Sequence, residues 1–118
     1  MPKVFVPPPP ALAAYPTIEE VIAIVASAHN VTVADIKGRK RIAGIVLWRH
    51  VAMWLACQLS GRSLPEIGRQ FGDFDHTSVL HARDRIERLL ETDEGLAARV
   101  AKLKKTLKET VRQRNAAG

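Results

Sequence analysis

The sequence of 118 residues has little of several things that would point to other classes of protein. Its single cysteine, Cys57, excludes an internal disulfide, and we expect it to be a small, inert packing residue. Only 5% of the residues are aromatic and β-branched runs are few, which favours helix over sheet. No apolar run approaches the roughly 18–20 residues needed to span a bilayer, and the first residues lack the apolar region of a signal peptide. We therefore expect a cytoplasmic protein with no membrane partner.

The sequence patterns of common catalytic and metal sites are also missing. No pair of the four histidines has H-E-x-x-H spacing, and one cysteine cannot build a zinc knuckle. There is no G-x-S-x-G nucleophile elbow, and no G-x-x-x-x-G-K-[ST] loop that could cradle a nucleoside triphosphate. We expect no enzyme activity, no metal, no cofactor and no ATP-driven step from this chain.

Acidic residues are missing from one long stretch, and positive charge gathers in two zones. The formal net charge is +6, from 18 Lys+Arg and 12 Asp+Glu. Residues 36–65 contain six Lys or Arg and no acid, and the chain after Glu94 holds seven Lys or Arg against Glu109 alone. Two such zones indicate a polyanion partner, although a solvated basic surface would have the same composition.

The length suits a single domain, and proline marks its beginning. A hydrophobic content of 47% is enough for a globular core. Six of the seven prolines lie in residues 1–16, which predicts a flexible proline-rich arm. We expect the folded domain over residues 17–112 and a disordered tail over residues 113–118.

Apolar residues at helical spacing, preceded by polar caps, predict an all-α domain. Thr17 begins a capping box before a helix that should end near Asn30. Thr32 begins a second box before a single helical turn, and a basic loop follows it at residues 37–41. A long helix central to the core is expected over about residues 41–59.

The stretch 63–81, SLPEIGRQFGDFDHTSVLH, carries the most specific pattern in the chain. Ser63 opens a third capping box with proline in the first turn, and Gly72 should stop this short helix. Asp75 can then cap a second helix that opens with His76 and Thr77. Two helices joined by a tight turn, the second opening with small polar residues, are typical of a helix-turn-helix that presents its second helix to a DNA groove.

A last helix is expected after Asp93, with an apolar stripe over residues 96–111 and basic residues on its other faces. This helix leaves two alternatives to a helix-turn-helix reader. In one, the chain is an interaction adaptor whose stripe docks a protein partner or a second copy. In the other, the chain binds nucleic acid generally, led by the basic helix.

Four stretches resemble one known family: VTVADIKGRKR at 31–41, VAMWLACQL at 51–59, SLPEIGRQFG at 63–72 and DHTSVLHA at 75–82. They resemble the C-terminal DNA-binding domain, domain IV, of the bacterial replication initiator DnaA. The resemblance covers about residues 17–110 and implies a Trp-repressor-like helical domain with a helix-turn-helix. It also implies sequence-preferring binding of double-stranded DNA at the bacterial nucleoid, in replication initiation or its regulation, or as a transcriptional regulator. We expect a stand-alone relative, because the sequence has no room for the initiator's ATPase module.

The resemblance also implies which residues face DNA. Asp75, His76 and Thr77 would read base edges in the major groove, where a carboxylate accepts from cytosine N4 and a threonine methyl packs on a thymine methyl. Arg41 occupies the position of the arginine that the family places in the minor groove. The residues expected to contact phosphates or border the groove are Arg39, Lys40, Arg49, Leu64, Pro65 and Ser78.

The turn of the helix-turn-helix departs from the family pattern. The family usually has GGRDHTT, and this chain has GDFDHTS. Asp73 therefore replaces a glycine and Phe74 replaces an arginine, which removes one positive charge and adds one negative charge. We expect affinity for DNA to be lower by roughly tenfold or more at physiological salt. The DNA sequence that is read is left open.

Overall fold

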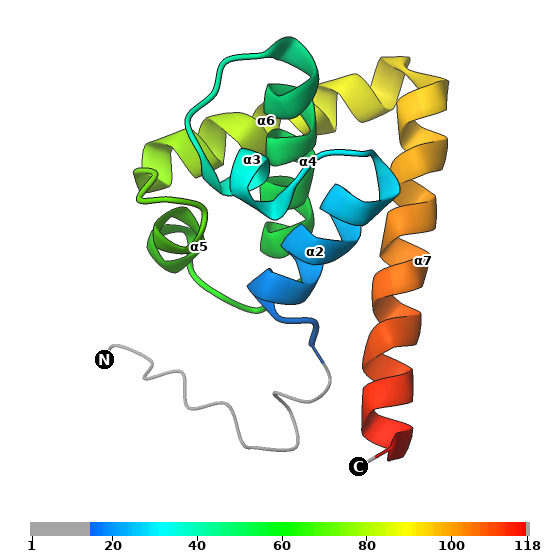
Figure 1. Cartoon of the computed structure of the whole chain (residues 1–118). Helices are drawn as coiled ribbons and strands as arrows, with labels where there is room; N and C mark the ends of the chain where they lie inside the picture. Colours follow the sequence, from blue (N-terminus) through cyan, green and yellow to red (C-terminus); the bar gives the residue numbers. More distant parts are fainter. Residues whose placement is uncertain (1–14, 118) are drawn as a thin grey trace, which may run out of the picture.

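The computed structural model describes residues 15–117, which form α-helices joined by loops and contain no strand. The predicted all-α class is confirmed. Residues 1–14 of the predicted proline-rich arm lie outside the described residues, and the predicted domain boundaries stay a prediction. The helices, shown in Figure 1, are α2 (Ile18–Ala28), α3 (Val33–Lys37), α4 (Ala43–Leu59), α5 (Leu64–Gln70), α6 (His76–Thr92) and α7 (Glu94–Ala117).

Hydroxyl caps begin three of these helices where the sequence predicts them. The Thr17 hydroxyl accepts from the Glu20 amide at 3.0 Å, and the Glu20 carboxylate accepts from the Thr17 amide at 2.9 Å. The same reciprocal pair opens α3. Ser63 accepts from the Glu66 amide at 3.3 Å. The Glu66 carboxylate lies 3.8 Å from the Arg62 guanidinium instead of returning to Ser63, so the third predicted capping box is half formed.

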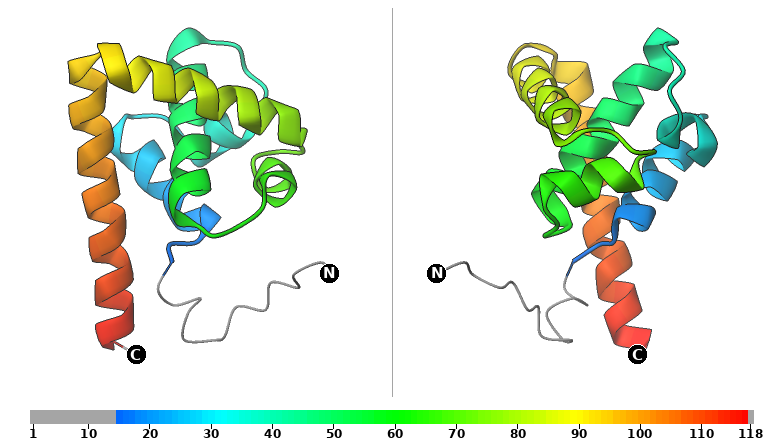
Figure 2. Two further views of the ribbon diagram at one scale, coloured as in Figure 1. Left: turned by 180° about the vertical axis from the view of Figure 1, so that it is seen from behind. Right: turned by 90° about the vertical axis from the view of Figure 1, so that its left-hand side faces the viewer.

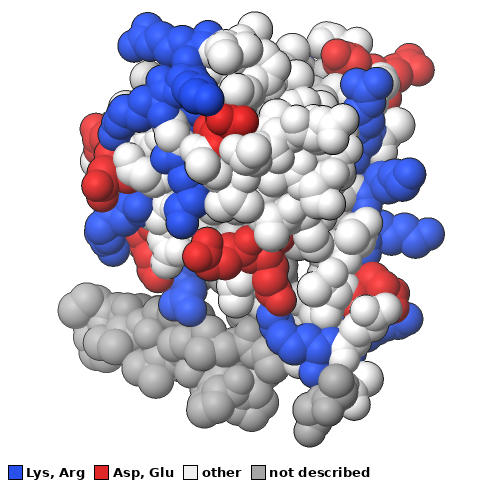
Figure 3. All heavy atoms as spheres, in the orientation of Figure 1, with Lys and Arg blue, Asp and Glu red and all other residues white. Residues whose placement is uncertain are grey.

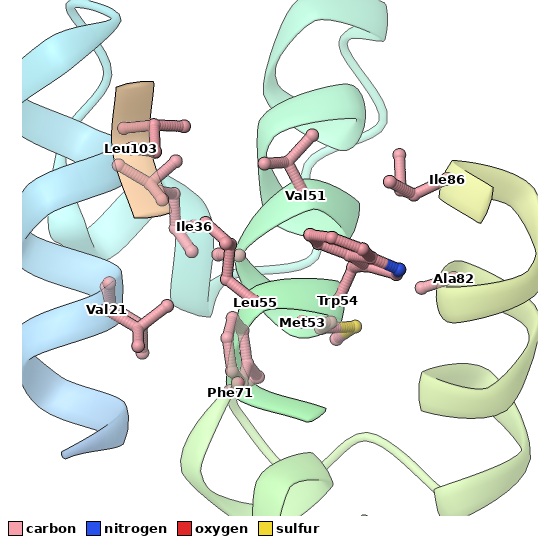
Figure 4. Packing of buried hydrophobic residues seen from close by; sticks show 14 of the residues in the cluster. Val21, Ile36, Val51, Met53, Trp54, Leu55, Phe71, Ala82, Ile86 and Leu103 are labelled. Carbon is pink, nitrogen blue, oxygen red and sulfur yellow. The ribbon is translucent and has the colours of Figure 1, made fainter. Parts of the chain in front are cut away.

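Helix α4 is the centre of the core, as the sequence predicts, although it begins at Ala43 rather than near residue 41. It packs against α2, α3, α5 and α6, and every residue from 51 to 56 is buried. Figure 4 shows Leu55 of this helix among Val21, Ile36 and Phe71, which come from three other parts of the chain. Because a fully buried Leu or Phe contributes about 1.5–3 kcal/mol, this cluster holds the helix-turn-helix firmly on α4.

Helix α6 crosses the molecule, and α7 runs along the side opposite α5 (Figures 1 and 2). Helix α7 packs against α2 and α6. The predicted apolar stripe of α7 is buried in this core, so it offers no docking surface for a partner or a second copy. The adaptor alternative therefore loses the surface on which it depended. The buried residues of the stripe are Leu96, Val100, Leu103, Leu107 and Val111.

Helix α7 continues to Ala117 and therefore includes residues 113–117, which the sequence predicted as a disordered tail. Arg114 holds this end of the helix to the start of the domain. Its Nη1 donates to the Glu20 carboxylate, and its Nη2 donates to the Tyr15 carbonyl at 2.8 Å. The helix at residues 113–117 differs from the predicted tail, and a local sequence pattern could not indicate it because these partners lie 94 and 99 residues away in the sequence.

A polar contact joins α4 to α6, the second helix of the helix-turn-helix. His50 Nδ1 lies 3.0 Å from Arg85 Nη1. Burial, and then the positive charges of Arg85 and Arg49, lower the pKa of His50 to about 4. The imidazole is therefore neutral at physiological pH, and its Nδ1 can accept the Arg85 N–H.

Candidate nucleic-acid interface

Helices α5 and α6 form a helix-turn-helix whose turn depends on two glycines. The Gly68 carbonyl accepts from the Phe74 amide at 2.8 Å, and a Cβ at position 68 would lie 2.0 Å from the Phe74 carbonyl oxygen. Gly72 has a φ of +104°, and a Cβ there would lie 2.0 Å from the Lys37 carbonyl oxygen. These two close approaches fix the turn against α5 on one side and against the end of α3 on the other.

The residues predicted to read bases lie at the exposed start of α6. Asp75 occupies the N-cap position with extended backbone, at φ −64° and ψ 150°. Within the described chain its side chain makes no capping hydrogen bond, which differs from the sequence prediction, and its Oδ1 lies 3.0 Å from His76 Nδ1. The side chains of Asp75, His76, Thr77 and Ser78 are all exposed. Their polar groups face solvent, as base-reading residues require.

The basic loop between α3 and α4 is tied to the turn of the helix-turn-helix. Arg39 Nη2 donates to the carbonyls of Gly72, at 3.2 Å, and Asp73, at 2.6 Å. The Arg39 guanidinium also lies 4.4 Å from the centre of the Phe74 ring. Exposed Arg41 lines a hollow of about 390 Å³ together with Arg39 and Phe74. Basic side chains gather over this part of the surface in Figure 3.

The contacts of Arg39 with the turn and with the Phe74 ring form a junction between the basic loop and the helix-turn-helix. Asp73 and Phe74, the two departures from the family pattern, both belong to it. Asp73 has a φ of +59°, a backbone region that Asp adopts more readily than most residues, so the turn keeps its shape without a glycine. Phe74 is half-buried against the core and presents its ring to Arg39. Phe74 therefore joins the turn to the basic loop instead of extending into solvent.

Arg49 occupies a different place from the one predicted. Its side chain is buried, with 4% exposure, and its guanidinium donates to three main-chain carbonyls in and before the basic loop. Burial, followed by repulsion from Arg39, lowers its pKa, although a guanidinium stays protonated in proteins. Arg49 thus braces the loop from inside, which argues against the predicted phosphate contact. The three carbonyls belong to Asp35 at 2.8 Å, Ile36 at 2.9 Å and Lys40 at 3.0 Å.

The other predicted contacts lie at the rim of this face. Leu64 is half-buried against the core, and Pro65 is exposed in the first turn of α5. Lys40 Nζ lies 3.0 Å from Asp35 Oδ1. The hydrogen bond from Lys40, followed by the one from the Thr32 amide, lowers the pKa of the Asp35 carboxyl. Because exposed ion pairs of this kind are weak, Lys40 can exchange Asp35 for a phosphate.

We expect the contact between Arg39 and Phe74 to stabilise the junction measurably. Phe74→Leu keeps an apolar side chain but removes the π face, and should lower the free energy of unfolding by about 1 kcal/mol. Phe74→Tyr keeps the face and should stay close to the wild type. Urea unfolding of Phe74→Leu, Arg39→Ala and the double variant should give a coupling energy of about 0.5–1 kcal/mol. A coupling energy of zero would mean that the ring acts through packing alone.

Residues 15–117 contain no group of three or more His, Cys, Asp or Glu placed to hold a metal ion. None of their helices is long and apolar enough to cross a bilayer. Burial raises the pKa of the Cys57 thiol, in keeping with an inert packing residue.

Comparison with known proteins identifies the family. A family model described as "Bacterial dnaA protein helix-turn-helix" matches residues 18–86, from the start of α2 into α6. The chain belongs to the bacterial DnaA helix-turn-helix family. The residues matched to this DnaA family include the basic loop, α5, the turn and the start of α6. Helix α7 begins at Glu94, beyond the match.

Individual DnaA proteins give the same result. Chromosomal replication initiator protein DnaA of Latilactobacillus sakei subsp. sakei (strain 23K) is 47% identical over 92 residues. The proteins of the same name from Rhodopseudomonas palustris (strain BisA53) and Cereibacter sphaeroides (strain ATCC 17029 / ATH 2.4.9) are 48% identical over 92 residues and 47% identical over 91 residues. These alignments cover 77–78% of this chain and 19–20% of the relatives. The chain therefore spans about a fifth of the length of the initiators it matches.

Proposed function

We propose that this chain binds double-stranded DNA with sequence preference, at initiator-box-like sites, in the initiation of DNA replication or its control. One observation carries the proposal: the exposed start of α6 and the Arg41 loop are held together by the junction between Arg39 and Phe74. Two elements already fixed relative to each other can enter neighbouring grooves of one duplex at a low entropic cost. Membership of the DnaA family supports DNA as the ligand.

The start of α6 has the chemistry for the major groove. The Asp75 carboxylate can accept from cytosine N4, and the Thr77 methyl can pack on a thymine methyl. His76 can donate or accept, depending on its tautomer. The Ser78 hydroxyl can bind a phosphate, and the partial positive charge at a helix N-terminus favours a phosphate nearby. Asp75, His76 and Thr77 would therefore read bases, and Ser78 would fix the position of the helix on the backbone.

The basic loop has the chemistry for the adjacent minor groove and its phosphates. Arg41 is exposed beside the junction and can extend into the groove as an arginine reader does. Lys40 and the exposed guanidinium of Arg39 can contact phosphates, which position the domain but carry no sequence information. Arg49 is left out of this set because it is buried and all three of its guanidinium nitrogens donate to carbonyls, whereas within the described residues Arg39 donates to carbonyls through Nη2 alone.

Selection of bound sequences from a random duplex pool would identify the site, and titration of the selected duplex would test the residues. Arg41→Ala and Thr77→Ala should each weaken specific binding by about 1–3 kcal/mol, because each removes a base contact. Matched controls are Arg88→Ala and Thr106→Ala, exposed residues that lie away from the start of α6. The controls should bind like the wild type. Equal binding by the wild type, Arg41→Ala and Thr77→Ala would reject the assignment.

The contribution of these 118 residues to replication is proposed to be site binding. They hold no P-loop, so they do not themselves supply an ATP-driven assembly step. A chain that occupies initiator boxes would compete with a full-length initiator for them. A mobility-shift competition between the two on a box-containing duplex tests this directly, since failure to displace the initiator at saturating concentration would contradict competition.

A further inference from the structure

Helix α7 presents a basic outer face that the proposed base-reading surface does not use. Eleven of the 18 Lys+Arg and eleven of the 12 Asp+Glu lie before Gly95, so the net charge of +6 arises from the part of the chain that α7 occupies. Figure 3 shows basic side chains along the outer edge of this helix. Lys104 is half-buried, 5.5 Å from the centre of the Trp54 ring. The exposed members of the face are Lys102, Lys105, Lys108 and Arg112.

The charge on this face is mostly not neutralised by neighbouring side chains. Among residues 15–117, no carboxylate lies within 4.0 Å of Lys102, Lys105 or Lys108. Glu109 is the single acid of α7 after Glu94, and it pairs with Arg112 at 3.3 Å. The face therefore carries a local excess of positive charge that suits a polyanion.

This face points away from the proposed base-reading surface. The base-reading residues lie in the first turn of α6, whose 17 residues make it about 25 Å long, and α7 begins beyond its last turn. Figure 1 and the left view of Figure 2 show α5 and α7 on opposite sides of the molecule. Charges at the two surfaces are largely screened from each other, because their separation exceeds the Debye length of about 8 Å at physiological salt. Since the two surfaces lie on opposite sides of the molecule, a straight duplex held at the start of α6 would leave the outer face of α7 open to a second ligand.

The spacing of the basic residues suits a nucleic-acid backbone. Lys104, Lys108 and Arg112 follow one another every four residues, a rise of about 6 Å along a helix. Alternate phosphates of one DNA strand are about 6.8 Å apart along the duplex axis. A helix that lies on a lipid surface needs apolar residues beside its cations. The apolar side chains of α7, including Leu103 and Leu107, are buried in the core instead.

We propose that the outer face of α7 binds the phosphate backbone of a second DNA segment, so that one molecule bridges two duplexes. The bridge rests on the proposed function, because the first duplex is held at the start of α6. The second contact lies beyond residues 18–86, which the family model matches. It is independent of sequence and weakens steeply with salt, because it releases counterions and reads no bases.

A two-duplex capture experiment tests the bridge. One duplex, carrying the selected sequence, is fixed to beads, and a labelled duplex of unrelated sequence is added with the full chain. The double variant Lys105→Gln, Lys108→Gln should lose about tenfold in affinity for the labelled duplex. Its slope of log affinity against log salt for that duplex should be smaller by about 2. Its binding to the bead duplex should stay within about twofold of the wild type, since glutamine preserves the helix.

Two single variants sharpen the result. Glu109→Gln removes the acid of the face and should strengthen capture of the labelled duplex. Arg88→Gln removes a positive charge from an exposed position of α6 and should leave capture of the labelled duplex unchanged. Capture by the double lysine variant equal to that of the wild type would overturn the bridge. Capture of anionic vesicles without capture of the second duplex would overturn it too, in favour of a lipid surface.

The experiment also separates failure of the bridge from failure of the proposed function. If the double lysine variant loses both duplexes while Arg41→Ala keeps the bead duplex, α7 is the main DNA surface and both proposals fall. If Arg41→Ala loses the bead duplex and the lysine variant loses only the labelled duplex, both are supported. If Arg41→Ala loses the bead duplex and the lysine variant captures the labelled duplex as well as the wild type does, the bridge is overturned and the proposed function stands.

Discussion

Gly72→Ala should lower the free energy of unfolding by about 3 kcal/mol, a large part of the 5–15 kcal/mol that is typical of a domain. The φ of +104° at this position is strained for any residue with a side chain. The added Cβ would also lie 2.0 Å from the Lys37 carbonyl oxygen, so the turn and the end of α3 would have to separate. Because Arg39 bonds to the Gly72 carbonyl, that movement would also release the basic loop.

Urea unfolding followed by circular dichroism measures this effect, and the chain offers a matched control. A Cβ at Gly44 would meet no atom of the described residues within 4 Å, and Gly44 lies in the first turn of α4. Gly44→Ala should therefore raise the free energy of unfolding by about 0.5–1 kcal/mol. The same substitution is thus expected to act in opposite directions at the two sites. Equal unfolding midpoints for Gly72→Ala and the wild type would contradict the close approach at the turn.

Arg49→Ala should lower the free energy of unfolding by about 3–4 kcal/mol, because it leaves three carbonyls without their charged donor. Arg49→Lys keeps the charge but has a single nitrogen, which cannot reach carbonyls spread around a planar guanidinium. We expect Arg49→Lys to recover only part of the loss. Urea unfolding of the two variants measures this difference. Full recovery by lysine would mean that charge alone matters at this position.

The salt dependence of DNA binding distinguishes the observed role of Arg49 from the predicted one. A residue that contacts a phosphate lowers the slope of log affinity against log salt by about 1 when it is removed. For Arg49→Gln, which removes the charge, we expect the slope to stay unchanged at a temperature where the variant is folded. Arg39→Ala should lower the slope, since its exposed side chain can reach a phosphate. A lower slope for Arg49→Gln would support the phosphate contact predicted from the sequence.

Local patterns made most of the fold predictable. The cap pairs of Thr17 and Thr32 join residues three apart, so their partners can be read directly from the sequence. The helix-turn-helix is also local, because Ser63, Gly72 and Asp75 mark the start of α5, the turn and the start of α6 within one short stretch of sequence. The apolar stripes then place each helix on the core, and the resemblance to the DnaA family agrees with them.

The features that the sequence did not reveal depend on partners far along the chain or on the main chain itself. Arg49 finds carbonyl acceptors 9 to 14 residues away, and every residue carries a carbonyl, so no pattern marks the right ones. Phe74 departs from the family pattern, but its contact with Arg39 joins residues that are separated in the sequence by two helices, α4 and α5. Asp75 has the residue type of a cap, yet its carboxylate faces His76. For Arg49 and Phe74 tertiary geometry decided among options that the sequence left equal, whereas at Asp75 the neighbouring side chain competes with the cap.

The charge distribution of the chain has a consequence for the rate at which it meets DNA. The residues before Gly95 have equal numbers of acidic and basic groups, so α7 supplies the net positive field of the molecule. Long-range attraction to a polyanion depends on that field and speeds diffusional encounter. The helix that touches no base would therefore set much of the association rate at low salt, whereas the start of α6 would set the lifetime of the complex once it has formed.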